Sequence, residues 1–90
     1  MQVGIHIIAR GIVQGVGFRY FVFHLAAKFD LGGFVANLPN GDVEIEVEGD
    51  RSLIEEFIKE VKVGPRAAYV SDLQIRWLDP DKHYKRFEIY

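Results

Sequence analysis

The chain has 90 residues, a formal net charge of −2 at pH 7 and no cysteine. The length fits a single domain over residues 1–90, and the missing cysteine excludes disulfides, thiolate metal sites and a cysteine nucleophile. The charge argues against a general nucleic-acid binder, because such proteins usually carry a basic excess. No run approaches the ~20 apolar residues of a membrane span, and no signal peptide is recognisable. We therefore expect a cytoplasmic, monomeric protein.

The first third of the chain predicts a strand, a glycine loop and a helix. Alternating apolar residues predict the strand: Val3, Ile5, Ile7 and Ala9. Residues 14–19 (QGVGFR) follow as a loop with two glycines. Apolar residues at helical spacing then predict the core-facing stripe of a helix: Phe18, Phe21, Val22, Leu25, Ala26 and Phe29. The pair Gly32–Gly33 is expected to end this helix.

The middle of the chain predicts a hairpin. Residues 34–38 are expected to form a second strand, and Asn40–Gly41 predicts a type I′ turn, which requires two positive φ angles. The third strand alternates apolar residues with carboxylates, which are Glu44, Glu46 and Glu48. One face of this strand therefore packs on the core, and the carboxylate face is expected to be solvated.

The last part predicts a second helix and two further strands. Asp50 or Ser52 caps the helix, and the sequence does not choose between them, because Ser52 with Glu55 also fits a capping box. Its buried stripe is Leu53, Ile54, Phe57, Ile58 and Val61. Gly64–Pro65 ends the helix. Alternation predicts a fourth strand through Leu73, Ile75 and Trp77, and after a turn a short last strand covers residues 86–90.

The order of elements is β-α-β-β-α-β with a short additional C-terminal strand. This order is typical of the α+β class and of the ferredoxin-like split βαβ sandwich, in which one antiparallel sheet carries two helices on one face. A fold of this kind hosts many unrelated functions. The function must therefore be argued from particular residues.

The glycine loop between the first strand and helix favours an anion. Gly15 and Gly17 allow a sharp bend, and loop N–H groups ahead of a helix N-terminus converge on one point. Arg19 adds a planar guanidinium that matches phosphate oxygens. The loop is neither a P-loop, since no lysine follows, nor a dinucleotide loop, since Tyr20 replaces its third glycine. An ordinary glycine turn with an ordinary arginine remains the alternative.

The segment Val13–Arg19 resembles the phosphate loop of acylphosphatases. Further segments are similar to that family in order and spacing, over nearly the whole chain: Gly33–Asn37, Leu38–Gly41, Gly49–Asp50 and Gly64–Ala67. Two positions depart from the family pattern. Phe34 stands where Trp is usual, which predicts a change of packing. Ala36 stands where a basic or polar residue is common, which alters how the rim attracts an anion.

The resemblance implies metal-free hydrolysis of acyl phosphates to carboxylate and inorganic phosphate, without a cofactor. It assigns phosphate binding to the loop, which comprises Gln14, Gly15, Val16, Gly17, Phe18 and Arg19. It assigns two catalytic residues, Arg19 to the phosphoryl group and Asn37 to the attacking water. From the residues alone, a turn residue at the end of a strand is the favoured interpretation of Asn37. The expected partners are small acyl phosphates and phosphate, without nucleic acid or membrane.

Other functions are weighed against this one. A catalytically silent anion-binding module retains the loop without turnover, and a detached domain of a larger carbamoyl-transfer maturation protein retains the same motif. An RNA-binding module would use the exposed aromatics on the sheet, but three glutamates on the third strand repel phosphates. The three histidines lack metal-ligand spacing, and they are His6, His24 and His83. We expect no metal site.

Overall fold

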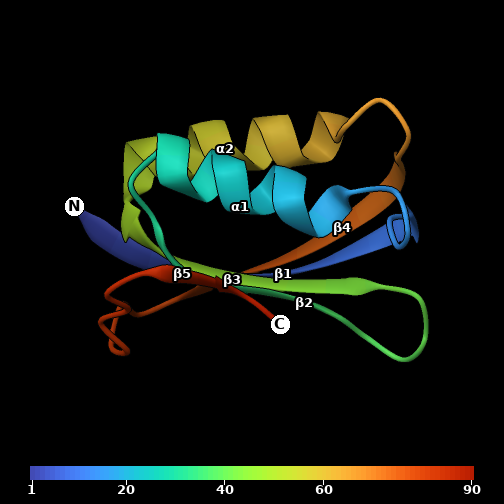
Figure 1. Ribbon diagram of the computed structural model, residues 1–90. Helices are drawn as coiled ribbons and strands as arrows, with labels where there is room; N and C mark the ends of the chain where they lie inside the picture. Colours follow the sequence, from blue (N-terminus) through green and yellow to red (C-terminus); the bar gives the residue numbers. More distant parts are fainter.

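The computed structural model describes all 90 residues, and Figure 1 shows a sheet with both helices on one face. The elements in chain order are β1 (Gln2–Ile12), α1 (Phe18–Lys28), β2 (Gly32–Asn37), β3 (Val43–Asp50), α2 (Arg51–Val63), β4 (Tyr69–Leu78) and β5 (Phe87–Ile89). The strand order in the sheet is β4-β1-β3-β2-β5. The predicted ferredoxin-like arrangement is confirmed. Neither helix has the length and apolar composition required to cross a bilayer.

The short last strand departs from the expected antiparallel sheet. The four long strands pair antiparallel, β1 with β3 and β4, and β2 with β3. Strand β5 instead pairs parallel to β2, through the registers Gly33–Phe87 to Val35–Ile89. The reason is topological. Because β4 runs opposite to β2, it ends where β2 begins, and the connecting segment delivers β5 to that same end. The sheet is therefore mixed.

The core lies between the helices and one face of the sheet. It comprises 16 buried apolar residues. On α1 the buried part of the predicted stripe is Phe18, Val22, Leu25 and Ala26, and on α2 it is Ile54, Phe57 and Val61. The strands contribute the alternating residues that the sequence predicts, such as Ile5 and Ile7. Each fully buried large aliphatic or aromatic side chain contributes roughly 1.5–3 kcal/mol.

The sequence predicts that the pair Gly32–Gly33 ends α1, and this prediction is wrong. The helix ends at Lys28, and the reversal occurs at Asp30, which has a φ of 55°. Both glycines belong to β2. A Cβ on Gly33 would collide with the main-chain oxygen of Glu46. Close approach of the neighbouring strand therefore explains this glycine, rather than the end of a helix.

The hairpin between β2 and β3 is not a type I′ turn. Only Gly41 has a positive φ, of 98°. The side chain of Asn40 instead accepts a hydrogen bond from the N–H of Asp42 at 3.0 Å, and the N–H of Leu38 donates to the Asp42 carbonyl at 2.9 Å. An Asx-type turn thus replaces the tighter one, because the Asn40 side chain bonds to the backbone two residues on.

Asp50 is the N-cap of α2. Its carboxylate accepts a hydrogen bond from the N–H of Ser52 at 3.2 Å. This contact decides between the two residues that the sequence offered, and it satisfies one of the free N–H groups at the start of the helix.

Candidate active site

The loop between β1 and α1 contains two glycines in a left-handed conformation. Gly15 has a φ of 73° and Gly17 a φ of 76°. Side chains of L-residues rarely adopt such angles. A Cβ at either position would meet no atom within 4 Å. The glycines are therefore required by the path of the backbone and not by close packing of the protein around them.

The loop delivers the chain to an uncapped helix N-terminus. Gly17 is the N-cap of α1, no side chain caps the helix, and its first turn contains no acidic residue. The first N–H groups of a helix lack partners within the helix and carry a partial positive charge. The start of α1 is thus suited to an anion, unlike α2, where the Asp50 carboxylate already occupies the equivalent place.

A small cavity joins the loop to the end of β2. Its volume is about 130 Å³, and its lining residues are Val13, Gly15, Gly17, Phe18, Arg19, Tyr20 and Asn37. At about 30 Å³ per water molecule this corresponds to roughly four waters, which is adequate for a phosphoryl group. The fold thus brings Arg19 and Asn37 together at the glycine loop. Tyr20 also lines this cavity, and its side chain is exposed. This residue was not predicted from the sequence, although its position next to Arg19 on the first turn of the helix could have indicated it.

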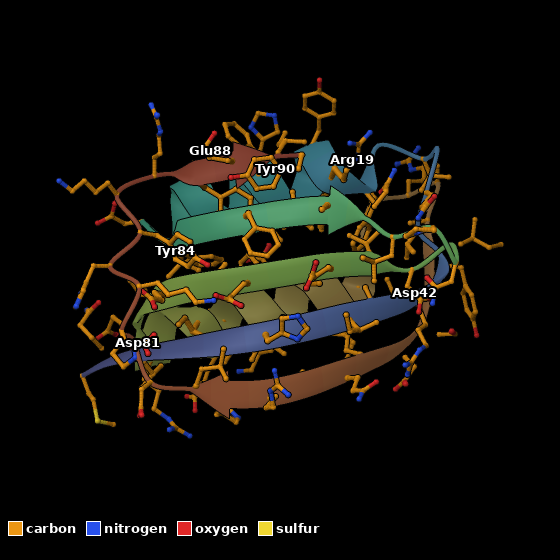
Figure 2. The ribbon with its side chains drawn as sticks, turned by 90° about the horizontal axis from the view of Figure 1, so that it is seen from below. Arg19, Asp42, Asp81, Tyr84, Glu88 and Tyr90 are labelled. Carbon is orange, nitrogen blue, oxygen red and sulfur yellow. The ribbon has the colours of Figure 1, made fainter.

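Arg19 reaches from the first turn of α1 to the end of the chain. Its Nη1 donates a hydrogen bond of 2.6 Å to the main-chain oxygen of Tyr90. Figure 2 shows Arg19 beside Tyr90 at the edge of the sheet. This hydrogen bond orients the guanidinium through one of its terminal nitrogens. Most of its N–H donors remain available to a phosphate.

Asn37 is the last residue of β2. Side chains alternate along a strand, and Val35 two residues earlier is fully buried beneath the helices. Asn37 therefore lies on the same side of the sheet as α1, at the point where the strand leaves the core, and its side chain is exposed. This position allows its amide to contact a water molecule in the cavity.

The side chain of Gln14 binds the neighbouring hairpin. Its Nε2 donates to the carbonyl oxygens of Leu38 and Asp42, both at 2.8 Å. These bonds use both hydrogens of the amide and tie the loop to the β2–β3 hairpin. Of the other predicted loop residues, Phe18 is buried and Val16 packs against the core. Their side chains therefore support the loop, and any contact with an anion comes from their main chain.

The carboxylates of β3 do not form a simple solvated face. Glu46 is only 6% exposed, and it accepts hydrogen bonds from Lys82 Nζ at 2.8 Å and Tyr84 Oη at 2.6 Å. Burial raises the pKa of the Glu46 carboxyl, but these hydrogen bonds outweigh burial and hold the pKa below its ordinary value. Glu44 pairs with His6 at 2.8 Å. The prediction of a solvated face is wrong for Glu46.

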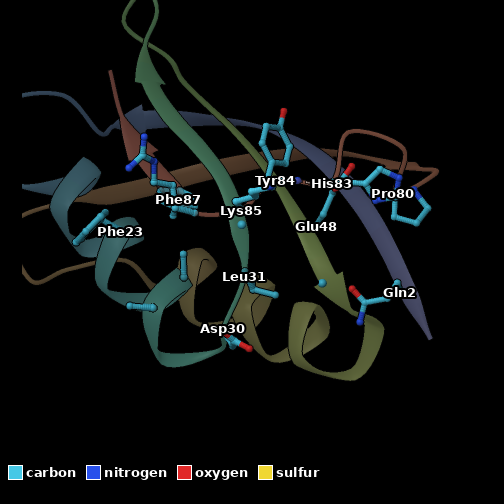
Figure 3. Close-up of a pocket in the computed structure, with 15 residues that line it drawn as sticks. Gln2, Phe23, Asp30, Leu31, Glu48, Pro80, His83, Tyr84, Lys85 and Phe87 are labelled. Atoms are coloured by element: carbon cyan, nitrogen blue, oxygen red, sulfur yellow. Dashed lines mark hydrogen bonds between the residues drawn. The ribbon is translucent and has the colours of Figure 1, made fainter.

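The largest cavity lies away from the glycine loop (Figure 3). Its volume is about 670 Å³. It is lined by 15 residues from the C-terminal half of α1, the start of β2, the end of β3 and the segment that leads into β5, and they include Leu31, Glu48 and Tyr84. It contains neither Arg19 nor Asn37. We therefore place the candidate site at the smaller cavity, where the arginine and the helix N-terminus meet. Elsewhere in the chain, no three His, Cys, Asp or Glu side chains gather in a metal-binding arrangement.

Valine in place of Gly15 or Gly17 is expected to raise the inhibition constant (Ki) of inorganic phosphate at least about tenfold. A residue with a Cβ in a left-handed conformation costs about 1–2 kcal/mol, and a β-branched residue costs more, so the loop rearranges. Competitive inhibition measures the effect. Gly41→Val is a matched control, because Gly41 also has a positive φ and open space around it. Equal phosphate affinity in all three variants and the parent would contradict the loop's role.

Comparison with known proteins agrees with this geometry. The family model described as acylphosphatase matches residues 5–89. A curated acylphosphatase of Caldanaerobacter subterraneus subsp. tengcongensis is 41% identical over 90 residues and covers 100% of both chains. The crystal structure of acylphosphatase from Bacillus subtilis superposes with a TM-score of 0.95 at 39% identity, covering 100% of this chain and 99% of that one.

A likeness also extends to one part of a much larger protein. The structure of full-length HypF in a phosphate- and nucleotide-bound form matches with a TM-score of 0.88 at 40% identity, covering 100% of this chain but 12% of that one. The curated relative and the Bacillus structure instead match end to end. The chain therefore belongs to the acylphosphatase family and is a hydrolase that acts on acyl phosphates.

Proposed function

We propose that the protein hydrolyses small acyl phosphates in the 130 Å³ cavity without a metal ion. Main-chain N–H groups of the loop from Gly15 to Arg19, together with the Arg19 guanidinium, hold the phosphoryl group, and Asn37 orients the attacking water. The observation that carries the proposal is the meeting of two left-handed glycines, an uncapped helix N-terminus, Arg19 and Asn37 at one cavity.

The chemistry requires little from the protein beyond placement and charge. An acyl phosphate is a mixed anhydride with a good leaving group. Water attacks phosphorus, the bond between phosphorus and the bridging oxygen breaks, and the carboxylate leaves with the electron pair. Phosphoryl transfer of this kind is mostly a matter of positioning and electrostatic stabilisation. The residues at the cavity supply both, since a strong base is not needed to drive the attack.

The two catalytic residues have separate tasks. The guanidinium of Arg19 is permanently charged and offers a planar fork to two phosphate oxygens. The hydrogen bond to Tyr90 supports this task because it fixes one Nη and leaves the rest of the fork free. The amide oxygen of Asn37 accepts a hydrogen bond from water and so aims its lone pair, and its NH₂ group adds no charge beside the phosphate.

Hydrolysis of benzoyl phosphate in the presence of EDTA is expected to proceed at the same rate as without EDTA, and inorganic phosphate is expected to inhibit competitively. The reason is that the cavity offers amides and a guanidinium but no set of metal ligands. A spectrophotometric assay of the purified protein, whose expected monomeric state is checked by light scattering, measures both quantities. A requirement for added magnesium or zinc would contradict the mechanism. Phosphate binding without turnover would instead favour a silent anion-binding module.

A further inference from the structure

Two carboxylates of β3 anchor the segment that leads into β5. They lie on the face of the sheet opposite the helices, which we term the open face. Glu46 accepts from Lys82 Nζ and Tyr84 Oη, at 2.8 and 2.6 Å. Glu48 accepts from the main-chain N–H groups of Lys82 and Tyr84, at 3.0 and 3.4 Å. The two glutamates thus bind both the side chains and the main chain of this segment. Glu46 is the only buried charged residue of the chain.

The anchor continues to the active site through aromatic rings. The Tyr84 ring packs edge-on against the Phe34 ring, with the ring centroids 6.4 Å apart. The centroids of the Phe34 and Tyr90 rings are 5.8 Å apart. The main-chain oxygen of Tyr90 then accepts the hydrogen bond from Arg19. Figure 2 shows Tyr84, Tyr90 and Arg19 following one another across the open face and the edge of the sheet. A continuous series of contacts therefore leads from Glu46 to the guanidinium.

Strand β5 needs such an anchor because its own pairing is short. It has three residues and pairs only with β2, at three positions. Short edge strands open locally at a lower cost in free energy than the central strands of a sheet. A buried carboxylate, in turn, is costly unless it is fully hydrogen-bonded. The ionised state of Glu46 is maintained by Lys82 and Tyr84, so the segment and the carboxylate hold each other in place.

We propose that Glu46 is a positioning residue for the hydrolysis: through Tyr84 and Phe34 it holds Tyr90, whose main-chain oxygen fixes the Arg19 guanidinium at the glycine loop. This inference rests on the proposed role of Arg19 in binding phosphate. Loss of the Glu46 contact releases the start of β5, and Arg19 then spends less time in the orientation that binds phosphate.

Two variants test the proposal. Glu46→Gln removes the charge, and Tyr84→Phe removes only the hydroxyl that Glu46 accepts while the ring stays against Phe34. Each is expected to raise the Ki of inorganic phosphate on the order of 3- to 10-fold, as for residues coupled through one network. Circular dichroism and thermal unfolding establish the temperature at which each variant is fully folded. Tyr84→Phe decides the question if Glu46→Gln does not fold.

Glu44→Gln is the matched control. Glu44 lies on the same strand and the same face, but its partner is His6 and not the segment before β5. The Ki of inorganic phosphate for the Glu44→Gln variant is expected to equal that for the parent protein. If Glu44→Gln weakens phosphate binding as much as Glu46→Gln, the effect is general loss of sheet stability and the proposal is wrong. Unchanged Ki in both Glu46→Gln and Tyr84→Phe, whatever their melting temperatures, also overturns it.

A double-mutant cycle with Arg19→Lys separates this inference from the proposed function. Phosphate binding is followed by the NMR shifts of the Gly15 and Gly17 amides, which do not depend on turnover. If Glu46 acts through Arg19, Tyr84→Phe weakens phosphate binding in the parent but has little effect in Arg19→Lys. The same factor in both backgrounds overturns the inference alone. Unchanged phosphate affinity in Arg19→Lys itself overturns the proposed role of Arg19, and the inference with it.

Discussion

Arg19→Lys is expected to lower kcat/KM for benzoyl phosphate on the order of 10³-fold and to weaken phosphate binding as well. Arginine contributions to phosphoryl transfer are of this size. Lysine keeps the positive charge but replaces a planar fork with a single ammonium. The three N–H donors of an ammonium diverge from one atom, so they do not reproduce the two parallel N–H groups that the guanidinium offers to a phosphate. Because the guanidinium contacts phosphate before and during the transfer, both ground-state binding and turnover decline.

A control for this substitution is Arg76→Lys. Arg76 lies on β4, the strand at the opposite edge of the sheet from β5, and its side chain is exposed. Its kinetic constants are expected to be those of the parent. The free energy of unfolding should change by less than about 1 kcal/mol in both variants, as for most substitutions of surface side chains. Near-normal turnover in Arg19→Lys would exclude the role proposed for this arginine.

Local patterns were sufficient to predict the elements of the fold because the chain alternates cleanly. The run from Val43 to Glu48 shows why, since its apolar residues are buried against the helices and its carboxylates lie on the other face. The same pattern gave the wrong environment for Glu46. Glu46 is bound by the Lys82 and Tyr84 side chains, which lie 36 and 38 residues later in the sequence. Alternation within a strand carries no information on which distant segment covers it.

Two errors in the chain reversals have a similar cause. Gly32–Gly33 and Asn40–Gly41 match common signals for a helix end and a tight hairpin. In the fold, Gly33 is required by the close approach of β3, and the Asn40 side chain bonds to its own turn. A glycine or asparagine at such a position indicates that the backbone there is restricted in some way. It does not say whether the constraint comes from local conformation or from a neighbouring strand.

The meeting of Arg19 and Asn37 at the glycine loop was predictable from the sequence, but the contacts that support the loop and the arginine were not. The glycines and Arg19 form a continuous motif with a physical reason for binding an anion. The pairing of Arg19 with Asn37 came from resemblance to a family, and the cavity now brings them together. No sequence signal indicated that the Gln14 amide binds the hairpin, or that Tyr90 accepts from Arg19. Both are contacts between segments distant in the sequence, made through main-chain oxygens that any residue type provides.

Asn37→Ala is expected to lower kcat on the order of 10²- to 10³-fold and to leave the Ki of inorganic phosphate nearly unchanged. Loss of one well-placed hydrogen-bonding group at a transition state has an effect of this size. The side chain lies at the end of β2 and is exposed, so its removal leaves no cavity in the core. An interaction with the attacking water is absent from the phosphate complex, and its loss therefore reduces turnover without reducing phosphate affinity.

The contrast between Asn37→Ala and Arg19→Lys is the sharper test, because it separates the residue that aims water from the residue that holds phosphate. The measurement is kcat together with the Ki of phosphate in each protein, after circular dichroism confirms the fold. Asn40→Ala, which replaces the chain's other asparagine in the hairpin turn, is the control and should keep the parent's kcat. If Asn37→Ala turns over normally, or if its phosphate affinity declines along with kcat, then Asn37 does not position the water, and the nucleophile must be oriented by the loop itself.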